Sequence, residues 1–402
     1  MGRNADFDVA RARADTPGVL RVIHLNNAGA GLAPRQVISA TVDHVELEGH
    51  IGPYEAAERS QAGIDRAYQA LAELINCDAR EVAVLDSATR AWGAALSSIP
   101  LGPGDRVLVS PMEYGSNYIS LLHLARRTGM SVEVVPSDAS GAVSVPALRG
   151  MLDERVKLVS ITHVPMHDGL VNPVAAIGEI VRGHGALYLV DACQSVGQLP
   201  VDVREIGCDL LVGSGRKYLR GPRGTGFLFG RYDVAERLNP LALGLDGAEW
   251  TGGDYRLAPG VRRFETWEAN CASKIGLAVA VDYALAWDVR ATWRRIERLA
   301  ARLRGELARI PGVRVEDRGD VRCGIVAVTA EGHESAALRR ELRDRCINTW
   351  VCLPNAACLD MQERGVSSVL RVSLHYYNTD EELDRLCSVL ESLVVGRQAH
   401  AV

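Results

Sequence analysis

Two charged side chains follow two apolar runs that are consecutive along the chain. Asp191 ends a run at 189–191, and Lys217 comes shortly after a second run at 210–214. Only a loop and one turn, at 197–208, separate the runs, and the carboxyl ends of parallel strands meet at one edge of a sheet. Alone, an aspartate in such a place usually caps a loop, and a lysine is usually solvated. Together, the two side chains predict a reactive site.

The residues around this pair suit a cofactor that is both aromatic and anionic. Ser214 and Arg216 precede Lys217, a glycine-rich loop follows at 221–226, and Ser87-Ala88-Thr89 begins a predicted helix. Amides at a helix N-terminus, hydroxyls and a cation bind phosphate. A buried carboxylate keeps a pyridine nitrogen protonated, and a desolvated lysine loses its proton and forms an imine. These are the requirements of pyridoxal 5'-phosphate (PLP), which we expect Lys217 to hold as a Schiff base.

The elements that position these residues alternate between strands and helices. Most of the predicted strands are apolar on both faces, which is typical of a parallel sheet covered by helices on each side. The pattern predicts an α/β fold. Strands are expected at 81–86, 106–110, 131–136, 157–164, 186–192, 210–214 and 226–230, with helices at 117–127 and 174–183.

The last third of the chain has a different pattern, and 402 residues are enough for two domains. Thr379 and Glu382 have the spacing of a capping box at the start of the last helix. We expect a large domain at 25–288 and a smaller α+β domain formed by 1–24 and 289–402. The expected elements are helices at 268–287, 289–310, 335–345 and 380–394, and strands at 323–329 and 369–376.

Composition excludes several classes of protein. The net charge is −5 with both signs scattered, which gives no basic surface for nucleic acid. No apolar run is long enough for a membrane, and residues 1–19 lack the apolar segment of a secretory signal. The nine cysteines show no C-x-x-C spacing, which argues against zinc and against a disulfide framework. We therefore expect a cytoplasmic protein without a metal, nucleic-acid or membrane partner.

Five separated motifs resemble the class-V aminotransferase superfamily of fold-type I PLP enzymes. This resemblance covers nearly the whole chain and implies a mainly parallel seven-stranded sheet with helices on both faces, a smaller α+β domain, and a homodimer. Segment 263–270 resembles the part contributed by the partner subunit. The motifs are Leu-Asn-Asn-Ala-Gly at 25–29, Glu-Tyr-Gly-Ser-Asn at 113–117, Asp-Ala-Cys-Gln-Ser-Val-Gly at 191–197, the segment 214–224 and Leu-Arg-Val-Ser at 370–373.

The resemblance also implies a role for each matching residue. Lys217 carries the cofactor and moves the substrate Cα proton, Asp191 pairs with the ring nitrogen, and Gln194 approaches the ring hydroxyl. Tyr114 stacks on the ring, and Arg371 grips the substrate carboxylate as a bidentate fork. The phosphate ligands are Ala88, Thr89, Ser214 and Arg216, to which the helix start adds Ser87, and Asn27 and Ala28 lie in the substrate-side motif. The residues themselves, apart from the resemblance, add two substrate-side candidates: Tyr54 and His167. Gly52-Pro53 before Tyr54 is more typical of a surface turn, and a histidine after a strand is more often a structural one.

Some positions depart from the pattern of cysteine desulfurases within this superfamily. Tyr114 and Arg216 stand where most desulfurases have histidine, and Met166 stands near the place of an asparagine that often contacts the ring hydroxyl. These departures leave PLP binding intact but favour another member of the group. The segments 216–224 and 263–265 look most like hercynylcysteine sulfoxide lyase and related cysteine C–S lyases.

Four reactions remain open. The preferred one is C–S β-elimination from a cysteine S-conjugate, which releases a thiol or sulfenate, pyruvate and ammonia. Desulfuration needs a cysteine nucleophile, for which Cys352 and Cys358 are candidates, although their flanking residues do not reproduce a desulfurase loop. Epimerisation, as in isopenicillin N epimerase-like proteins, and decarboxylating or oxidative processing of such conjugates are the others. A binding protein with a decayed site would lack Lys217 or Asp191, and both are present.

Overall fold

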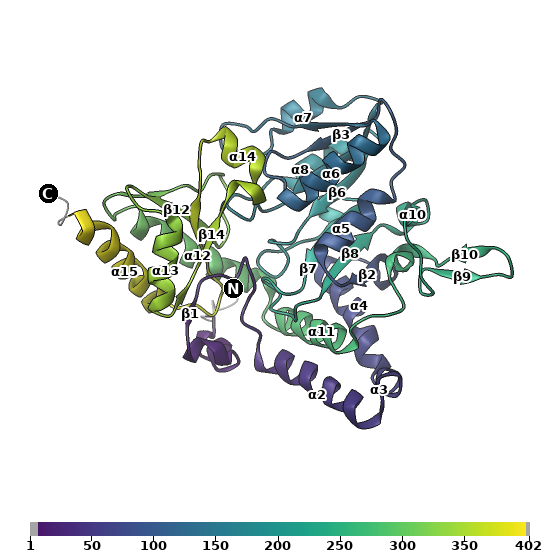
Figure 1. Cartoon of the computed structure of the whole chain (residues 1–402), viewed down its shortest axis with the longest axis horizontal. Coiled ribbons are helices and arrows are strands. Elements are labelled where there is room, and N and C mark those ends of the chain that lie inside the picture. Colours follow the sequence, from purple (N-terminus) through teal and green to yellow (C-terminus); the bar gives the residue numbers. More distant parts are fainter. Residues whose placement is uncertain (1–6, 399–402) are drawn as a thin grey trace, which may run out of the picture.

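A seven-stranded sheet forms the centre of the computed structural model, which describes residues 7–398 (Figure 1). The strand order is β2-β8-β7-β6-β5-β3-β4. β8 is antiparallel to β2 and β7, and the other four pairs are parallel. All seven predicted strands are confirmed, and so is the mainly parallel sheet. The strands are β2 (Val82–Leu85), β3 (Arg106–Val109), β4 (Ser131–Val134), β5 (Val156–Thr162), β6 (Leu187–Asp191), β7 (Leu210–Ser214) and β8 (Gly226–Gly230).

Helices cover both faces of this sheet, as predicted. Alternate residues of one strand enter two separate apolar cores: Leu211 joins one, whereas Leu210 and Val212 join the other. The second core is closed by α5 (Ala88–Ser97), α6 (Gly115–Thr128) and α10 (Tyr232–Ala235). The first is closed by α4 (Gln61–Ile75), α7 (Val145–Met151), α8 (Val174–Arg182), α9 (Val203–Ile206) and α11 (Cys271–Ala286). The helix α2 (Arg35–Ile51) packs against α11, and α3 (Pro53–Arg59) follows it.

A four-stranded antiparallel sheet with the order β11-β12-β15-β14 forms the centre of the C-terminal part. The predicted capping box is confirmed, because Glu382 N donates to Thr379 Oγ1 and Thr379 N donates to Glu382 Oε2, each at 3.3 Å. The elements here are β11 (Val313–Val315), β12 (Ile325–Ala330), β14 (Trp350–Cys352), β15 (Val369–Ser373), α12 (Val289–Leu307), α13 (Ser335–Asp344), α14 (Cys358–Glu363) and α15 (Asp380–Gln398).

The N-terminal segment joins this C-terminal part. β1 (Ile23–His24) pairs in parallel with β13 (Ile347–Asn348), after the short helix α1 (Val9–Ala14). Leu25 lies in the same apolar core as residues of α12 and β15. The expected division into a large domain at 25–288 and a small one at 1–24 and 289–402 stays a prediction. No described helix is long and apolar enough to cross a membrane.

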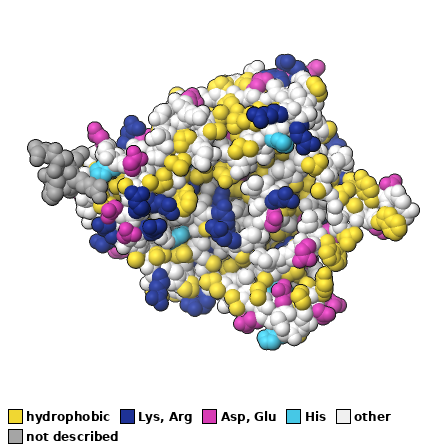
Figure 2. Space-filling model, in the orientation of Figure 1, with side chains coloured by type: hydrophobic (Ala, Val, Ile, Leu, Met, Phe, Trp, Pro, Cys, Tyr) yellow, Lys and Arg dark blue, Asp and Glu magenta, His cyan; other side chains and the backbone are white. Residues whose placement is uncertain are grey.

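A β-hairpin projects from the side of the molecule that contains the seven-stranded sheet (Figure 1). Its strands are β9 (Ala248–Trp250) and β10 (Tyr255–Leu257), which lie at the right of the molecule in Figure 1. Trp250 and Tyr255 are both exposed on it, and apolar side chains are visible on this projection in Figure 2. The sequence patterns gave no signal for this hairpin, whose strands are short.

The start of α5 packs against β8 at a glycine. A Cβ atom at Gly226 would lie 2.3 Å from Ala88 N and 2.3 Å from Ser87 C, both of which are backbone atoms. Gly226 therefore lets the N-terminus of α5 reach the edge of the sheet where Lys217 is also found.

We predict that Gly226→Ala lowers the free energy of unfolding by about 1–3 kcal/mol, because the backbone must shift to admit the methyl group. Chemical denaturation of the protein measures this loss. Gly93→Ala within α5 is the matched control. Nothing lies within 4 Å of its added Cβ, so it should leave stability unchanged or raise it by up to about 1 kcal/mol. Equal unfolding midpoints for Gly226→Ala and the wild type would contradict the prediction.

Candidate active site

A cavity lies at the carboxyl ends of the central strands. The residues that the sequence predicts to hold the cofactor come from β6, β7, the start of α5, the start of α6 and the loops that follow the strands. The structure brings all nine of them to the wall of this one cavity: Ser87, Ala88, Thr89, Tyr114, Asp191, Gln194, Ser214, Arg216 and Lys217. Their individual roles stay predictions.

Lys217 is the lysine placed to form an imine. The chain has three lysines, and Lys157 is exposed while Lys274 is held by Tyr68 and Glu265 at 3.1 Å each. Burial lowers the pKa of Lys217, and the charges of Arg216 and Arg371 act in the same direction. The neutral amine, which is the nucleophilic form, is therefore favoured at this position.

The carboxylate of Asp191 is fixed by two donors. Cys193 N donates to Oδ1 at 2.9 Å, and Asn117 Nδ2 donates to Oδ2 at 3.0 Å. Asp191 ends β6 and is 6% exposed, so its two oxygens keep one orientation towards the cavity. A protonated ring nitrogen is the partner that such a buried carboxylate favours.

A second buried acid, Glu113, is linked to Asp191 through the side chain of Asn117. Its Oε1 accepts from Asn117 Nδ2 at 2.9 Å, from Thr162 Oγ1 at 3.1 Å and from Tyr114 N at 3.1 Å. Burial, reinforced by the charge of Asp191, raises the pKa of Glu113 to about 7. The Asn117 amide thus bridges two buried acids, Glu113 and Asp191. The motif at 113–117 contains both Glu113 and Asn117, but the sequence gave neither of them a role.

One end of the cavity suits a phosphate. Ser87 caps α5, since its Oγ accepts from Arg90 N at 3.2 Å, and the free amides of the first helical turn face this end. The guanidinium of Arg216 is fixed by donating from Nη1 to the carbonyl oxygen of Gly29. Burial lowers the pKa of Arg216, and the charge of Arg223 acts in the same direction. A bound dianion would relieve this accumulation of positive charge.

Gln194 offers an unused acceptor in the wall of the cavity. Its Nε2 donates to the carbonyl oxygen of Ala28 at 3.0 Å, whereas its buried Oε1 has no partner among the described residues. A hydroxyl on the cofactor ring would satisfy this oxygen. With a desolvated lysine, a fixed acid and a phosphate-binding end, the residues present fit PLP.

Arg371 reaches the site from β15. It is 2% exposed, and its Nη1 donates to the carbonyl oxygen of Met166 at 2.9 Å while Nη2 donates to Asn26 Oδ1 at 2.9 Å. Its Nε has no partner in the described part of the chain. Arg371 does not line the cavity itself, but it contacts the wall through Met166, which does. A buried guanidinium with an unused N–H is suited to binding a carboxylate.

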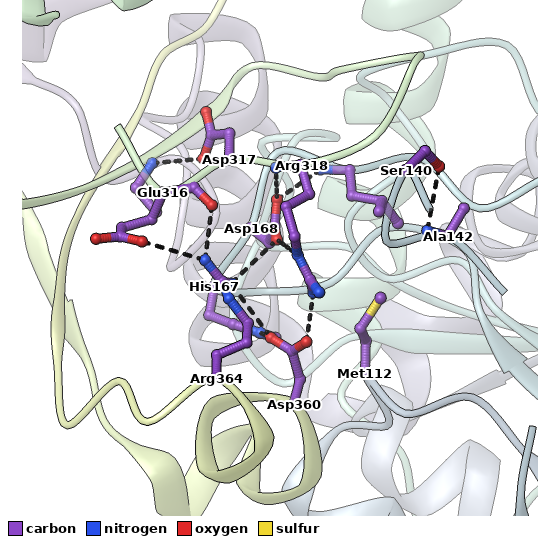
Figure 3. A network of polar contacts seen from close by, with 12 residues as sticks. Met112, Ser140, Ala142, His167, Asp168, Glu316, Asp317, Arg318, Asp360 and Arg364 are labelled. Atoms are coloured by element: carbon purple, nitrogen blue, oxygen red, sulfur yellow. Dashed lines mark hydrogen bonds and ion pairs between the residues drawn. The ribbon is translucent and has the colours of Figure 1, made fainter. Parts of the chain in front are cut away.

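The remaining substrate-side candidates do not line the cavity in the single chain. Asn27 is fully buried, donating to Ser373 O at 2.8 Å and accepting from Tyr377 OH at 2.5 Å, and Ala28 contributes its carbonyl oxygen to Gln194. Tyr54 is 71% exposed on α3. The ring of His167 is bonded to Asp360 instead of facing the cavity (Figure 3).

The cysteines expected as possible nucleophiles differ in burial. Cys352 ends β14, is 1% exposed, and has its Sγ 3.8 Å from the carbonyl oxygen of Met166. Burial raises the pKa of the Cys352 thiol, so the thiolate is disfavoured. Cys358 begins α14 and is half-buried. Among residues 7–398, no group of three histidine, cysteine or acidic side chains is placed to hold a metal ion.

Comparisons with known proteins agree on one family. The family model "Aminotransferase class-V" matches residues 23–386. A probable cysteine desulfurase of Methanothermobacter thermautotrophicus is 31% identical over 395 residues, covering 95% of this chain and 97% of that protein. A cysteine desulfurase of Klebsiella pneumoniae is 28% identical over 413 residues, covering 96% and 98%.

Solved structures share the fold over nearly the whole chain. The apo cysteine desulfurase of Thermococcus onnurineus has a TM-score of 0.91 at 24% identity, covering 98% of this chain and 100% of that one. The cystine C–S lyase C-DES, in complex with cysteine persulfide, has a TM-score of 0.85 at 23% identity, covering 94% and 99%. The expected fold-type I architecture is confirmed.

We predict that Glu113 makes stability fall as the pH rises. Its pKa is 4.5 when unfolded and about 7 when folded, so the unfolded chain loses this proton first and the folded state loses stability between those two pH values. Glu113→Gln should reduce the change in the free energy of unfolding between these two pH values by up to about 3 kcal/mol. Urea unfolding of both proteins at pH 5 and pH 8 measures it. A difference between variant and wild type that is the same at both pH values would contradict the prediction.

Proposed function

The chain belongs to the aminotransferase class-V family, and we propose from this membership that it is a PLP enzyme that cleaves the C–S bond of cysteine or a cysteine derivative. The proposal rests on one observation. The buried amine of Lys217 and the carboxylate of Asp191, which is fixed by hydrogen bonds, line the same cavity. When bound, PLP would accept the electron pair left by the substrate Cα–H bond.

The side chains in and beside the cavity have separate roles in this reaction. Lys217 takes the proton from the substrate Cα, for which its lowered pKa prepares it. Asp191 would keep a proton on the nitrogen of a bound ring, and Asn117 holds its carboxylate in place. Tyr114, which lines the cavity, would stack on that ring. Arg371 orients the substrate through its carboxylate, so that the Cα–H bond faces the lysine.

Within this class, we favour β-elimination from a cysteine S-conjugate. Removal of the Cα proton and departure of the sulfur substituent, followed by hydrolysis, give a thiol or sulfenate, pyruvate and ammonia. This route needs no protein thiolate. The burial of Cys352 in β14 and its raised pKa support it, because both oppose attack by this cysteine on sulfur.

Cysteine desulfuration is the second candidate. The relatives named above are cysteine desulfurases, and Cys352 lies beside Met166 at the edge of the cavity, within the influence of the Arg371 charge, which lowers the pKa of its thiol and opposes the effect of burial. A movement that exposed this thiol would allow it to accept sulfur from the substrate.

We also propose that the enzyme is a cytoplasmic homodimer. Ile38, Val42 and Val45 form an exposed apolar stripe along α2. Trp267 is 58% exposed in the segment that resembles a partner-subunit contribution. Apolar surface of this kind is typical of subunit contacts.

We predict that Lys217→Ala lowers kcat by at least about 10³-fold, since the variant lacks both the cofactor link and the base. Borohydride reduction of the wild-type enzyme followed by peptide mapping should place the cofactor label on Lys217. The other two lysines serve as internal controls within the same digest. A label on Lys157 or Lys274, or turnover by the variant, would refute the assignment.

We predict that Cys352→Ser keeps kcat/KM for a cysteine S-conjugate within about threefold, because elimination needs no thiolate and the serine hydroxyl can still donate to Met166 O. Mass spectrometry of the products measures pyruvate against persulfide. Cys358→Ser is the matched control. Complete loss of turnover in Cys352→Ser alone, with persulfide formed by the wild type, would favour desulfuration.

A further inference from the structure

A buried network of charged side chains joins three segments next to the cavity (Figure 3). One segment follows β5 in the large domain, another follows β11 in the small sheet, and the third is α14 with the residue after it. The network contains His167 and Asp168 from the first segment, Glu316, Asp317 and Arg318 from the second, and Asp360 and Arg364 from the third, with Arg304 of α12 bonded to Asp317.

His167 and Asp360 form the innermost pair. His167 Nε2 lies 2.7 Å from Asp360 Oδ2, and both side chains are 1% exposed. Burial alone would raise the pKa of Asp360, but its bonds and charges from His167, Arg318 and Arg364 lower it to about 2. Asp360 is therefore ionised and can only accept, so Nε2 of His167 carries the proton that joins the pair.

The peptide next to His167 reaches the substrate end of the cavity. The side chain of Met166 lines the cavity, and its carbonyl oxygen accepts from Arg371 Nη1 at 2.9 Å. On the other side of His167, Asp168 accepts from Arg318 N at 3.0 Å and from Arg318 Nε at 3.2 Å. The three consecutive residues 166–168 are thus held from three places in the C-terminal part, namely β15, the segment after β11, and α14, and the direction of the Met166 carbonyl is held with them.

We propose that His167 and Asp360 are a positioning pair for the substrate carboxylate. They fix the direction of the Met166 carbonyl group, which accepts a hydrogen bond from Arg371. This bond orients the guanidinium so that its unpartnered Nε–H can donate to the substrate carboxylate. The pair does not contact the substrate itself. This inference rests on the proposed function, because it concerns the same substrate end, and it assigns His167 a role different from that of a direct substrate ligand.

Binding of an unreactive amino acid tests the pair without turnover. Glycine carries the carboxylate and methylamine lacks it, and the visible absorption of the PLP-loaded enzyme reports the binding of both. His167→Leu should weaken glycine binding by about tenfold or more and leave methylamine binding unchanged. His167→Gln, whose amide can still donate to Asp360, should restore most of the glycine affinity. Asp360→Ala, which removes the acceptor, should resemble His167→Leu and provides the test if that variant does not fold.

Two further variants distinguish failure of the proposed function from failure of the positioning pair alone. Arg314→Gln changes an arginine that is 72% exposed and bonds Glu316 at the outer edge of the network, so glycine should bind as in the wild type. Arg371→Gln should lose glycine affinity at least as strongly as His167→Leu. Normal glycine binding by Arg371→Gln would remove Arg371 from the proposed function and the pair with it.

Other outcomes overturn the pair alone. If Arg371→Gln loses glycine while folded His167→Leu and Asp360→Ala bind glycine normally, the pair does not position Arg371. If His167→Leu weakens glycine and methylamine by the same factor, the pair only supports packing. Failure of His167→Gln to recover any affinity lost in His167→Leu would also contradict a bond to Asp360 as the cause.

Discussion

The site depends on the removal of one amine from water. Lys217 lies where β7 ends, and the loop after it is held closed by Gly221 N on Gly215 O at 2.8 Å and by Gly215 N on Thr225 O at 3.1 Å. An ammonium group placed there loses its hydration, so the neutral amine gains relative stability. The fixed charge of Asp191 works against this effect and that of Arg216 works with it. Reactivity at this position therefore follows from burial first and from neighbouring charges second.

Much of the cofactor end could be predicted from the sequence because its signals are local. An apolar run identifies a strand, and residues at its end or in the loop just after it lie at the carboxyl edge of a parallel sheet. Asp191, Ser214 and Lys217 all satisfy this rule, and Ser87 satisfies the rule for a helix start. These rules identify the cavity wall without knowledge of the tertiary structure, although they say nothing about which atoms contact a bound ring.

The substrate end could not be predicted in the same way because its contacts join distant parts of the chain. His167 and Asp360 are separated by 193 residues, and nothing near either residue identifies the other. A histidine after a strand suits a substrate contact and a structural bond equally well. Tyr54 illustrates a different limit: Gly52-Pro53 suggests a turn, but proline is also favoured in the first turn of a helix, and here it begins α3.

The two ends of the cavity are therefore formed by different parts of the fold. The cofactor end rests on the strand ends and the first turns of α5 and α6, which belong to the large sheet and its helices. The substrate end rests on Arg371 of β15 and on loops held by buried ion pairs with α14. Changes in α14 or in 166–168 can alter the position of Arg371 while Lys217 and Asp191 stay in place. A family can then keep one cofactor and one fold while its members act on different cysteine derivatives.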